Sequence, residues 1–273
     1  MRCARAAARR TVLHVDHRVL SALCVLQAVS VEDGALAGAW GVKIALSTVA
    51  TFPVFGEIDA GGDTYYLTVR TWNEADAAYD VDVQLCGGRT YDTIAGTSTI
   101  PHASYQTVTV VEPPVLIIDH ARGTYAQNDL LELWALADLP DPWTTELPQT
   151  PDEAASEPHA SRITDPDEDA NPGLTSSLEG AIEGHVYFIQ RRVVQLDPGV
   201  VVQEGKIQGL VTHATENITV GSDNEVINQS LEEVPNPDPK KTWFEEVRLG
   251  DEADCEDVLA AIEDETISRV QPF

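Results

Sequence analysis

A short acidic stretch carries the residues best suited to chemistry. Asp165, Asp167, Asp169 and Asn171 alternate in a segment rich in proline and aspartate that ends at Gly173. If this segment forms a curved loop, four side-chain oxygens point toward one position. Ca²⁺ accepts such oxygen ligands at loosely defined geometry. We therefore predict a calcium site at these four residues, and calcium as the one cofactor.

Two positions of this loop depart from the calcium-binding helix–loop–helix pattern. Ala170 stands where the sharp turn requires glycine, and Ser176 stands where a bidentate glutamate belongs. The alternation resembles instead the Asp-rich calcium loops of extracellular repeat proteins. The alternative is a solvated acidic linker that holds no ion.

The sequence contains no recognisable set of catalytic residues, so no catalytic residue is predicted. The seven histidines lack zinc-type spacing, and neither a Gly-x-Ser-x-Gly turn nor a glycine-rich phosphate loop occurs. His185 and His213 lie in predicted strands and could face inward, but packed histidines far outnumber catalytic ones. Glu245 and Glu246 are adjacent, and neighbouring strand residues face opposite sides, which argues against a glycosidase pair.

The beginning of the chain predicts export. Five of the thirteen arginines lie in the first eighteen residues, and an apolar run at 19–31, too short to span a bilayer, follows them. Ala28-Val29-Ser30 offers a cleavage site. One alternative is that 19–31 forms the first core strand of a cytosolic protein. Another is a lipid anchor on Cys24, although Leu23 breaks that motif.

Two cysteines remain after an export segment at 1–31 is removed. In an exported protein, Cys86 and Cys255 predict one disulfide that closes a very long loop. If the chain stays in the cytosol, the alternative is two buried free thiols.

The charge balance excludes some partners. Asp and Glu number 45 against 17 Lys and Arg, which gives a formal charge of −28. A field of this sign repels nucleic acid and anionic membrane surfaces. A salt-rich environment, where self-repulsion is screened, would explain the charge without any ligand.

Strand signals dominate from Gly38 onward, in runs rich in β-branched and aromatic residues or alternating with period two. The predicted strands are 42–49, 64–71, 78–85, 91–100, 105–111, 115–119, 174–182, 184–196, 200–203, 207–213, 217–220 and 241–249. Segment 130–137 is ambiguous between strand and helix. Segment 140–173 is a long proline- and acid-rich loop because it has too few large apolar residues to pack. Segment 255–264 is a short helix.

Trp40 and Arg248 stand at the two ends of this pattern. Gly38-Ala39-Trp40 stands at the start of the first predicted strand, and Arg248 stands near the end of the last one. The arrangement resembles lipocalin-like (calycin) barrels, in which such a tryptophan closes the barrel base and a cation lies over its ring. An ordinary core tryptophan is the alternative, and the Thr-Asp-Tyr turn of true lipocalins is missing.

Most of the chain also resembles a group of uncharacterised exported proteins of myxobacteria and their relatives. The likeness rests on the Gly-x-Trp, on Cys86, on the Asp-rich loop, and on Phe244-x-x-Val247-Arg248 followed by Cys255. The resemblance implies that this protein is exported and shares the fold of that group, but it implies no activity.

These observations predict an all-β fold in residues 32–273, an antiparallel barrel or barrel-like sandwich with one inserted acidic loop. The expected function is a non-enzymatic binding module outside the cytoplasm, by fold analogy one that holds a small apolar ligand in the barrel. The alternatives are a structural or surface-interaction protein with a filled barrel, and an exported hydrolase.

Overall fold

A computed structural model describes residues 34–52, 55–111, 114–119 and 124–268. The predicted export segment and Cys24 lie outside these residues. The strands are β1 (Gly38–Phe52), β2 (Gly56–Asn73), β3 (Ala78–Thr90), β4 (Gly96–Thr99), β5 (Thr109–Val111), β6 (Val115–Asp119), β7 (Thr124–Gln127), β8 (Leu130–Trp134), β9 (Leu174–Gly180), β10 (Gly184–Leu196), β11 (Gly199–Gln203), β12 (Lys206–Ser222), β13 (Glu232–Pro235) and β14 (Trp243–Arg248). The helices are α1 (His102–Tyr105), α2 (Pro151–Ala154) and α3 (Cys255–Glu263), with 3-10 turns η2 (Ala160–Arg162), η3 (Glu225–Ile227) and η4 (Pro239–Lys241).

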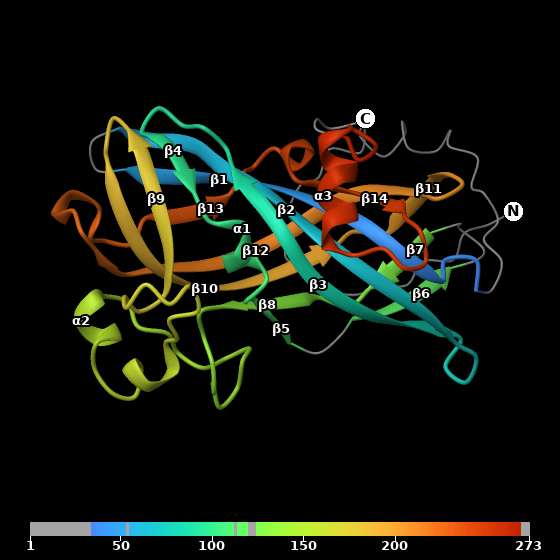
Figure 1. Cartoon of the computed structure of the whole chain (residues 1–273), viewed down its shortest axis with the longest axis horizontal. Coiled ribbons are helices and arrows are strands. Elements are labelled where there is room, and N and C mark those ends of the chain that lie inside the picture. The colour runs from blue at the N-terminus through green and yellow to red at the C-terminus, as the bar shows by residue number, and fades with distance from the viewer. Residues whose placement is uncertain (1–33, 53–54, 112–113, 120–123, 269–273) are drawn as a thin grey trace, which may run out of the picture.

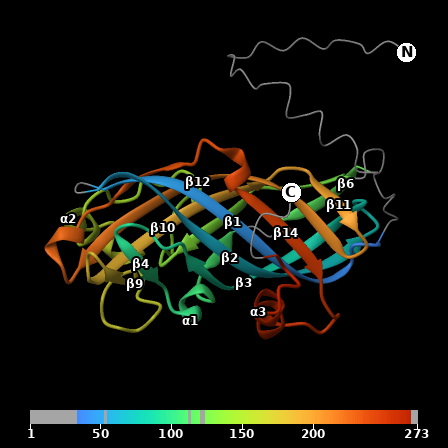
Figure 2. The same cartoon turned by 90° about the horizontal axis from the view of Figure 1, so that it is seen from above.

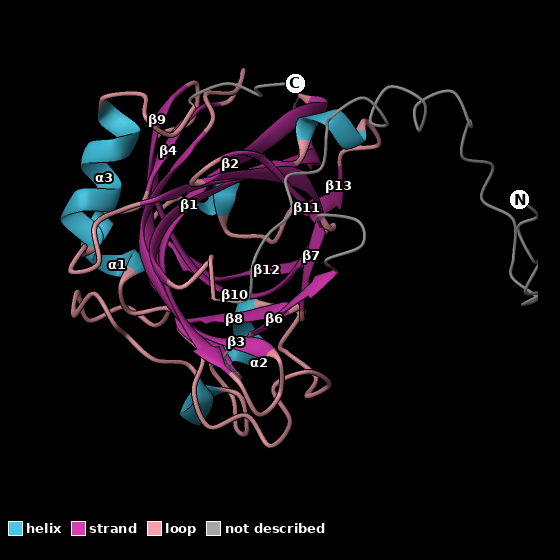
Figure 3. Ribbon diagram, turned by 90° about the vertical axis from the view of Figure 1, so that its right-hand side faces the viewer, coloured by secondary structure: helices cyan, strands magenta, loops and turns pink. Residues whose placement is uncertain are grey.

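These strands form one 14-stranded sheet in which the paired strands are antiparallel. The predicted all-β fold is thereby confirmed. The sheet curls on itself around an apolar interior (Figures 1 and 3). At one end β11 pairs with both β7 and β12, which completes a ring in the order β12, β14, β1, β2, β3, β6, β7, β11. Within the described residues, no helix has the length and apolar character needed to cross a membrane.

The other end of the molecule is built differently. The second half of β12 pairs with β10, which in turn pairs with β8 and β9. Strand β4 pairs with β9, and β13 pairs with the end of β1. The wall at this end therefore consists of β4, β8, β9, β10 and β13 together with the second half of β12 and the end of β1.

Side chains of alternate residues divide between two faces of the sheet. Trp40, Val42, Ile44 and Leu46 of β1 point inward and are at most 5% exposed, because period two places them on the face that the curled sheet encloses. The outer face of β1, β2 and β3 forms a second apolar cluster against α3 (Figures 2 and 3).

A disulfide links this helix to the sheet. Cys86 of β3 and Cys255 of α3 are bonded at an S–S distance of 2.00 Å, which confirms the predicted pairing. Asp254 begins α3 with a capping box that it forms with Asp257. Val258, about one turn after Cys255 in α3, is fully buried in the same apolar cluster as Cys86.

Two predicted strands were too long. In 91–100 only β4 is a strand, because Thr93 and Gly96 form a tight turn in which Gly96 has a φ of 134°. In 105–111 only β5 is a strand. Tyr105 ends α1 instead and is buried edge-on against Trp134, with 5.4 Å between the ring centroids.

Other strands also differ from the prediction. Segments 207–213 and 217–220 are parts of one strand, β12, because polar Thr215 and Asn217 continue the alternation. Strands β7 and β13 were not predicted, since each has only four residues and polar neighbours. The ambiguous segment 130–137 contains β8.

The acidic segment 140–173 contains no strand, as predicted, and packs against the sheet. Leu147 and Ala154 of this segment are buried. Leu136 and Ile163 form a β-bridge that ties the segment to the end of β8.

Candidate functional site

The interior contains a cavity of about 310 Å³. It lies at the end away from β11, between β4, β9, β10, β12, β13 and the ends of β1 and β2. Much of its lining is apolar and includes Leu46, Ile100, Leu178, Phe188 and Leu231.

The mouth of the cavity lies beside η3 and the turn between β3 and β4. Val226 lines the cavity and is still 57% exposed, so it borders both the interior and the solvent. Thr93 and Ala95 line the cavity from the opposite turn, and Ile94 between them is 71% exposed.

One wall of the cavity is polar. Strands β10 and β12 pair with Gln190 opposite Asn217 and Arg192 opposite Thr215, and all four line the cavity. His213 lines it one position further along β12 on the same face. The cavity therefore combines apolar sides with a row of hydrogen-bonding groups.

Arg192 forms a buried ion pair behind this wall. Its Nη2 lies 2.5 Å and its Nε 2.8 Å from Oε2 of Glu132, which is fully buried. Nη2 also donates to the Tyr66 hydroxyl at 3.2 Å, and the guanidinium lies over the Trp134 ring at 5.1 Å.

The carboxylate of Glu132 is saturated with donors. Tyr66 donates to its Oε1 at 2.5 Å, and the Trp134 indole donates to its Oε2 at 2.9 Å. Burial first, and then the charge of Glu132, raise the pKa of Tyr66, so its hydroxyl stays protonated. Together with Arg192, these donors engage both oxygens of the Glu132 carboxylate.

His213 presents an unpaired acceptor. Its Nε2 lies 3.3 Å from the carbonyl oxygen of Ser47, and since a carbonyl only accepts, we assign the ring proton to Nε2. Nδ1 is then an acceptor, and it is buried with no hydrogen-bond partner among the described residues. Burial, and next the charge of Arg192, lower the pKa of His213 to about 4, so the ring is neutral at pH 7.

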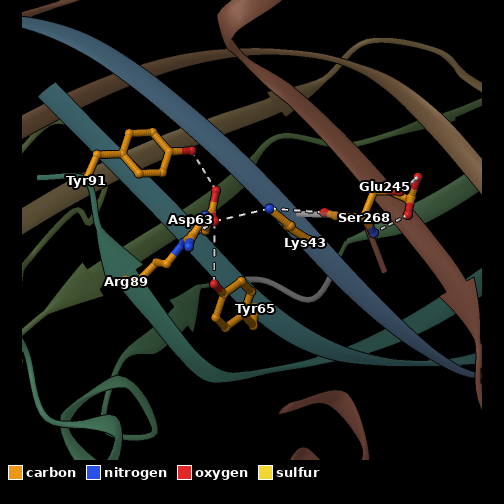
Figure 4. A network of polar contacts seen from close by, with 7 residues as sticks. All are labelled: Lys43, Asp63, Tyr65, Arg89, Tyr91, Glu245 and Ser268. Carbon is orange, nitrogen blue, oxygen red and sulfur yellow. Dashed lines mark hydrogen bonds and ion pairs between the residues drawn. The ribbon is translucent and has the colours of Figure 1, made fainter. Parts of the chain in front are cut away.

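A second polar network connects the sheet to the C-terminal segment (Figure 4), and its Asp63, Arg89 and Tyr91 also line the cavity. Asp63 is 2% exposed and accepts hydrogen bonds from Arg89 at 2.8 Å and Tyr91 at 2.6 Å. Its Oδ2 also pairs with Lys43 at 3.1 Å. Lys43 in turn donates to the carbonyl of Ser268 at 3.1 Å.

Glu245 completes this network. It accepts from the Ser268 backbone at 2.7 Å and pairs with Lys206 at 3.0 Å. Glu246 turns to the opposite face, where Oε2 lies 2.5 Å from Arg70. The two glutamates thus face opposite sides, as the strand pattern predicted, and the network around Glu245 fastens the C-terminal segment to the sheet.

The cation over the ring of Trp40 differs from the predicted one. Trp40 is 1% exposed and lies opposite Arg248 in the β1–β14 ladder. The guanidinium over its ring, at 4.6 Å, belongs to Arg70 of β2. Arg248 is exposed and donates to the carbonyl of Ala35. Arg70 of the neighbouring strand is buried and points inward together with Trp40.

The structure brings three of the four predicted calcium ligands together. One carboxylate oxygen from each of Asp165, Asp167 and Asp169 lies within 4.8 Å of the others. Several of these oxygens accept hydrogen bonds from the loop's own backbone, including Asp165 from Ala170 and Asp169 from Asn171. Calcium binding stays a prediction.

We expect millimolar Ca²⁺ to stabilise the protein through this loop. A site with a Kd of about 1 mM, at tenfold excess of the ion, adds about 1.4 kcal/mol and raises the Tm by roughly 3–5 °C. Thermal melts with and without Ca²⁺ measure the shift, which Asp167→Asn should remove and Asp152→Asn, an exposed acid of the same segment, should keep. An equal shift with Mg²⁺, or no shift at all, would contradict the site.

Sequence reasoning missed the buried pair of Glu132 and Arg192. A signal was available: each charge interrupts an apolar run, in Leu130–Trp134 and in Gly184–Leu196. Of the two histidines that could face inward, His213 does so. His185 lies at the surface, where its Nδ1 pairs with Asp223 at 2.7 Å.

Comparisons with protein-family models, with curated proteins and with solved structures found no match to this chain.

Proposed function

We propose that this protein is a non-enzymatic binding module that holds a small, largely apolar molecule in the cavity between β10, β12 and β9. The observation that carries the proposal is the cavity itself, about 310 Å³ with apolar sides and one polar wall. Small-molecule sites commonly begin at this volume and combine an apolar lining with a few polar groups.

A structural protein with a filled barrel is the alternative, and it accounts less well for this cavity. A barrel that serves only as a scaffold gains dispersion energy when side chains fill its interior. An unfilled cavity loses this dispersion energy, and polar groups that line it without partners destabilise the fold further. Ligand binding gives a reason to keep both.

We also propose that the module works outside the cytoplasm. The Cys86–Cys255 disulfide supports this location, because disulfides persist in oxidising compartments and are rare in the cytosol. Mass spectrometry of the protein from its own host tests the proposal, because removal of the predicted export segment lowers the mass of the chain.

A cavity-filling variant tests the binding function. Thr215 lines the cavity, and Thr212 lies on the same strand with its side chain exposed. We expect the neutral fluorophore N-phenyl-1-naphthylamine to bind the wild type with enhanced emission. Thr215→Phe should weaken this binding roughly tenfold by occupying the volume, whereas Thr212→Phe should leave it within about twofold.

Two results would overturn the proposal. One is the absence of any fluorescence enhancement with the wild-type protein. The other is equal affinity of the wild type and the Thr215→Phe variant, provided that circular dichroism shows both to be folded. Native mass spectrometry of protein from its own host adds an independent readout, the mass of a retained ligand.

A further inference from the structure

We propose that the ligand carries a neutral carbonyl group whose oxygen accepts a hydrogen bond from Arg192 at the deep end of the cavity. This inference rests on the proposed function and names the chemical class of the ligand.

Arg192 turns one nitrogen toward the open volume. Its Nε and Nη2 are engaged with Glu132 and Tyr66, and Nη1 donates to no described residue. Nη1 is not among the enclosed side-chain atoms that lack a partner, so part of its surface is accessible. The side chain lines the cavity and is 7% exposed. A ligand oxygen in the cavity is therefore offered a charged donor.

Gln190 adds a second group on the same wall. It lies two positions from Arg192 on the same face of β10, lines the cavity and is 9% exposed. Its side-chain amide has no hydrogen-bond partner within the described residues, and neither polar atom of the amide is enclosed. Buried amides are as a rule hydrogen-bonded, so Nε2 of Gln190 is available as a second donor to the ligand.

The donors of this wall favour a carbonyl over a hydroxyl. A guanidinium donates and never accepts. Two acceptors near it are closed to a ligand, because both oxygens of Glu132 are engaged and Nδ1 of His213 is enclosed. The wall thus offers more donors than acceptors. A carbonyl oxygen, which only accepts, fits it better than a hydroxyl, whose proton also needs a partner.

The paired charges around the cavity favour a neutral carbonyl over a carboxylate. The charge of Arg192 is balanced by Glu132, and Arg89 pairs with Asp63. Glu233 is the remaining carboxyl group of the described lining, and it adds no positive charge in either protonation state. A carboxylate would therefore lose its hydration without an unbalanced cation to replace it.

Arg192 lies at the deep end of the cavity. Trp134, which contacts its guanidinium and also lines the cavity, is 3% exposed, whereas Val226 at the mouth is 57% exposed. From Arg192 to Val186 the lining of β10 spans about 20 Å, with Phe188 between them. Since Phe188 and Val186 are apolar, the tail of the ligand runs along this stretch toward the mouth.

Four ten-carbon probes separate this inference from the proposed function: 2-decanone, 1-decanol, decanoate and decane. Each probe displaces N-phenyl-1-naphthylamine from the wild type at pH 7, and the midpoint of the displacement is measured. We expect 2-decanone to act at roughly threefold lower concentration than 1-decanol and at roughly tenfold lower concentration than decanoate. Decane reports the contribution of the tail alone.

Variants of the wall tie the preference to its donors. Arg192→Lys keeps a charge for Glu132 but lacks Nη1, so it should raise the 2-decanone midpoint roughly tenfold and leave that of decane within about twofold. Gln190→Leu should raise the 2-decanone midpoint roughly threefold. Arg191→Lys, on the opposite face of β10, is the matched control and should behave as the wild type.

The outcomes distinguish the two claims. If the fluorophore binds but 2-decanone gains nothing over 1-decanol or decanoate, or if Arg192→Lys leaves its midpoint unchanged, the inference is wrong and the binding function stands. Should Arg192→Lys fail to fold by circular dichroism, Gln190→Leu decides, because its amide has no partner to lose within the described residues. An unchanged 2-decanone midpoint in that variant contradicts the inference. If the fluorophore does not bind at all, the proposed function itself fails.

Discussion

Replacing Cys86 and Cys255 together with serine should lower the free energy of unfolding by about 3–5 kcal/mol. The bond joins residues 169 positions apart, and the loss of loop entropy in the unfolded chain grows with that length. It also holds α3 over the apolar cluster of β1, β2 and β3. Urea unfolding followed by tryptophan fluorescence measures the effect.

The reduced wild-type protein is the control for this prediction. It should unfold at the same urea concentration as the double variant, because both lack the bond and differ by two atoms. A difference below about 1 kcal/mol between the oxidised and reduced wild type would show that the packing of α3, through Val258, holds the helix without the bond.

Glu132→Gln should cost about 3–5 kcal/mol of stability. The change keeps the shape of the side chain but removes the charge that balances Arg192, which is 7% exposed and cannot lose its proton. The hydrogen bonds from Tyr66 and Trp134 also weaken, because they lose a charged acceptor. Thermal and urea unfolding measure the loss.

The neighbouring arginine offers a matched control. Arg191 faces the other side of β10 and pairs with Glu216, whose side chain is 47% exposed. Glu216→Gln should therefore cost no more than about 1 kcal/mol. In the double variant Glu132→Gln with Arg192→Met, the cost should be less than the sum of the two single costs, since no unbalanced charge remains. Additive costs would contradict the ion-pair interpretation.

The sheet could be predicted from sequence because its strands repeat with period two. Tyr79, Val81 and Val83 alternate with polar residues in β3, and the alternation alone places them on one face. The position of the long loop followed from its lack of large apolar residues. The disulfide followed from the number of cysteines and the predicted export.

The closure of the sheet and the cavity could not be predicted in this way. The period-two pattern predicts which face of the sheet a residue occupies, but it does not predict which strands pair with each other. Arg70 is placed over Trp40 by the β1–β2 register, and no local pattern distinguishes it from Arg248. The cavity likewise depends on how far apart the facing walls lie, which only the assembled strands determine.

The position of β14 between β1 and β12 bears on how the protein reaches this structure. The ladders of β14 join residues near the two ends of the described chain, such as Trp40 and Arg248. During synthesis, the edges of β1 and β12 that pair with β14 therefore stay unpaired until β14 has been made, although the other edge of each strand has partners. Such exposed strands pair readily with other chains, and contacts between distant residues form slowly. A chaperone that covers these edges on the nascent chain should accordingly raise the yield of folded protein.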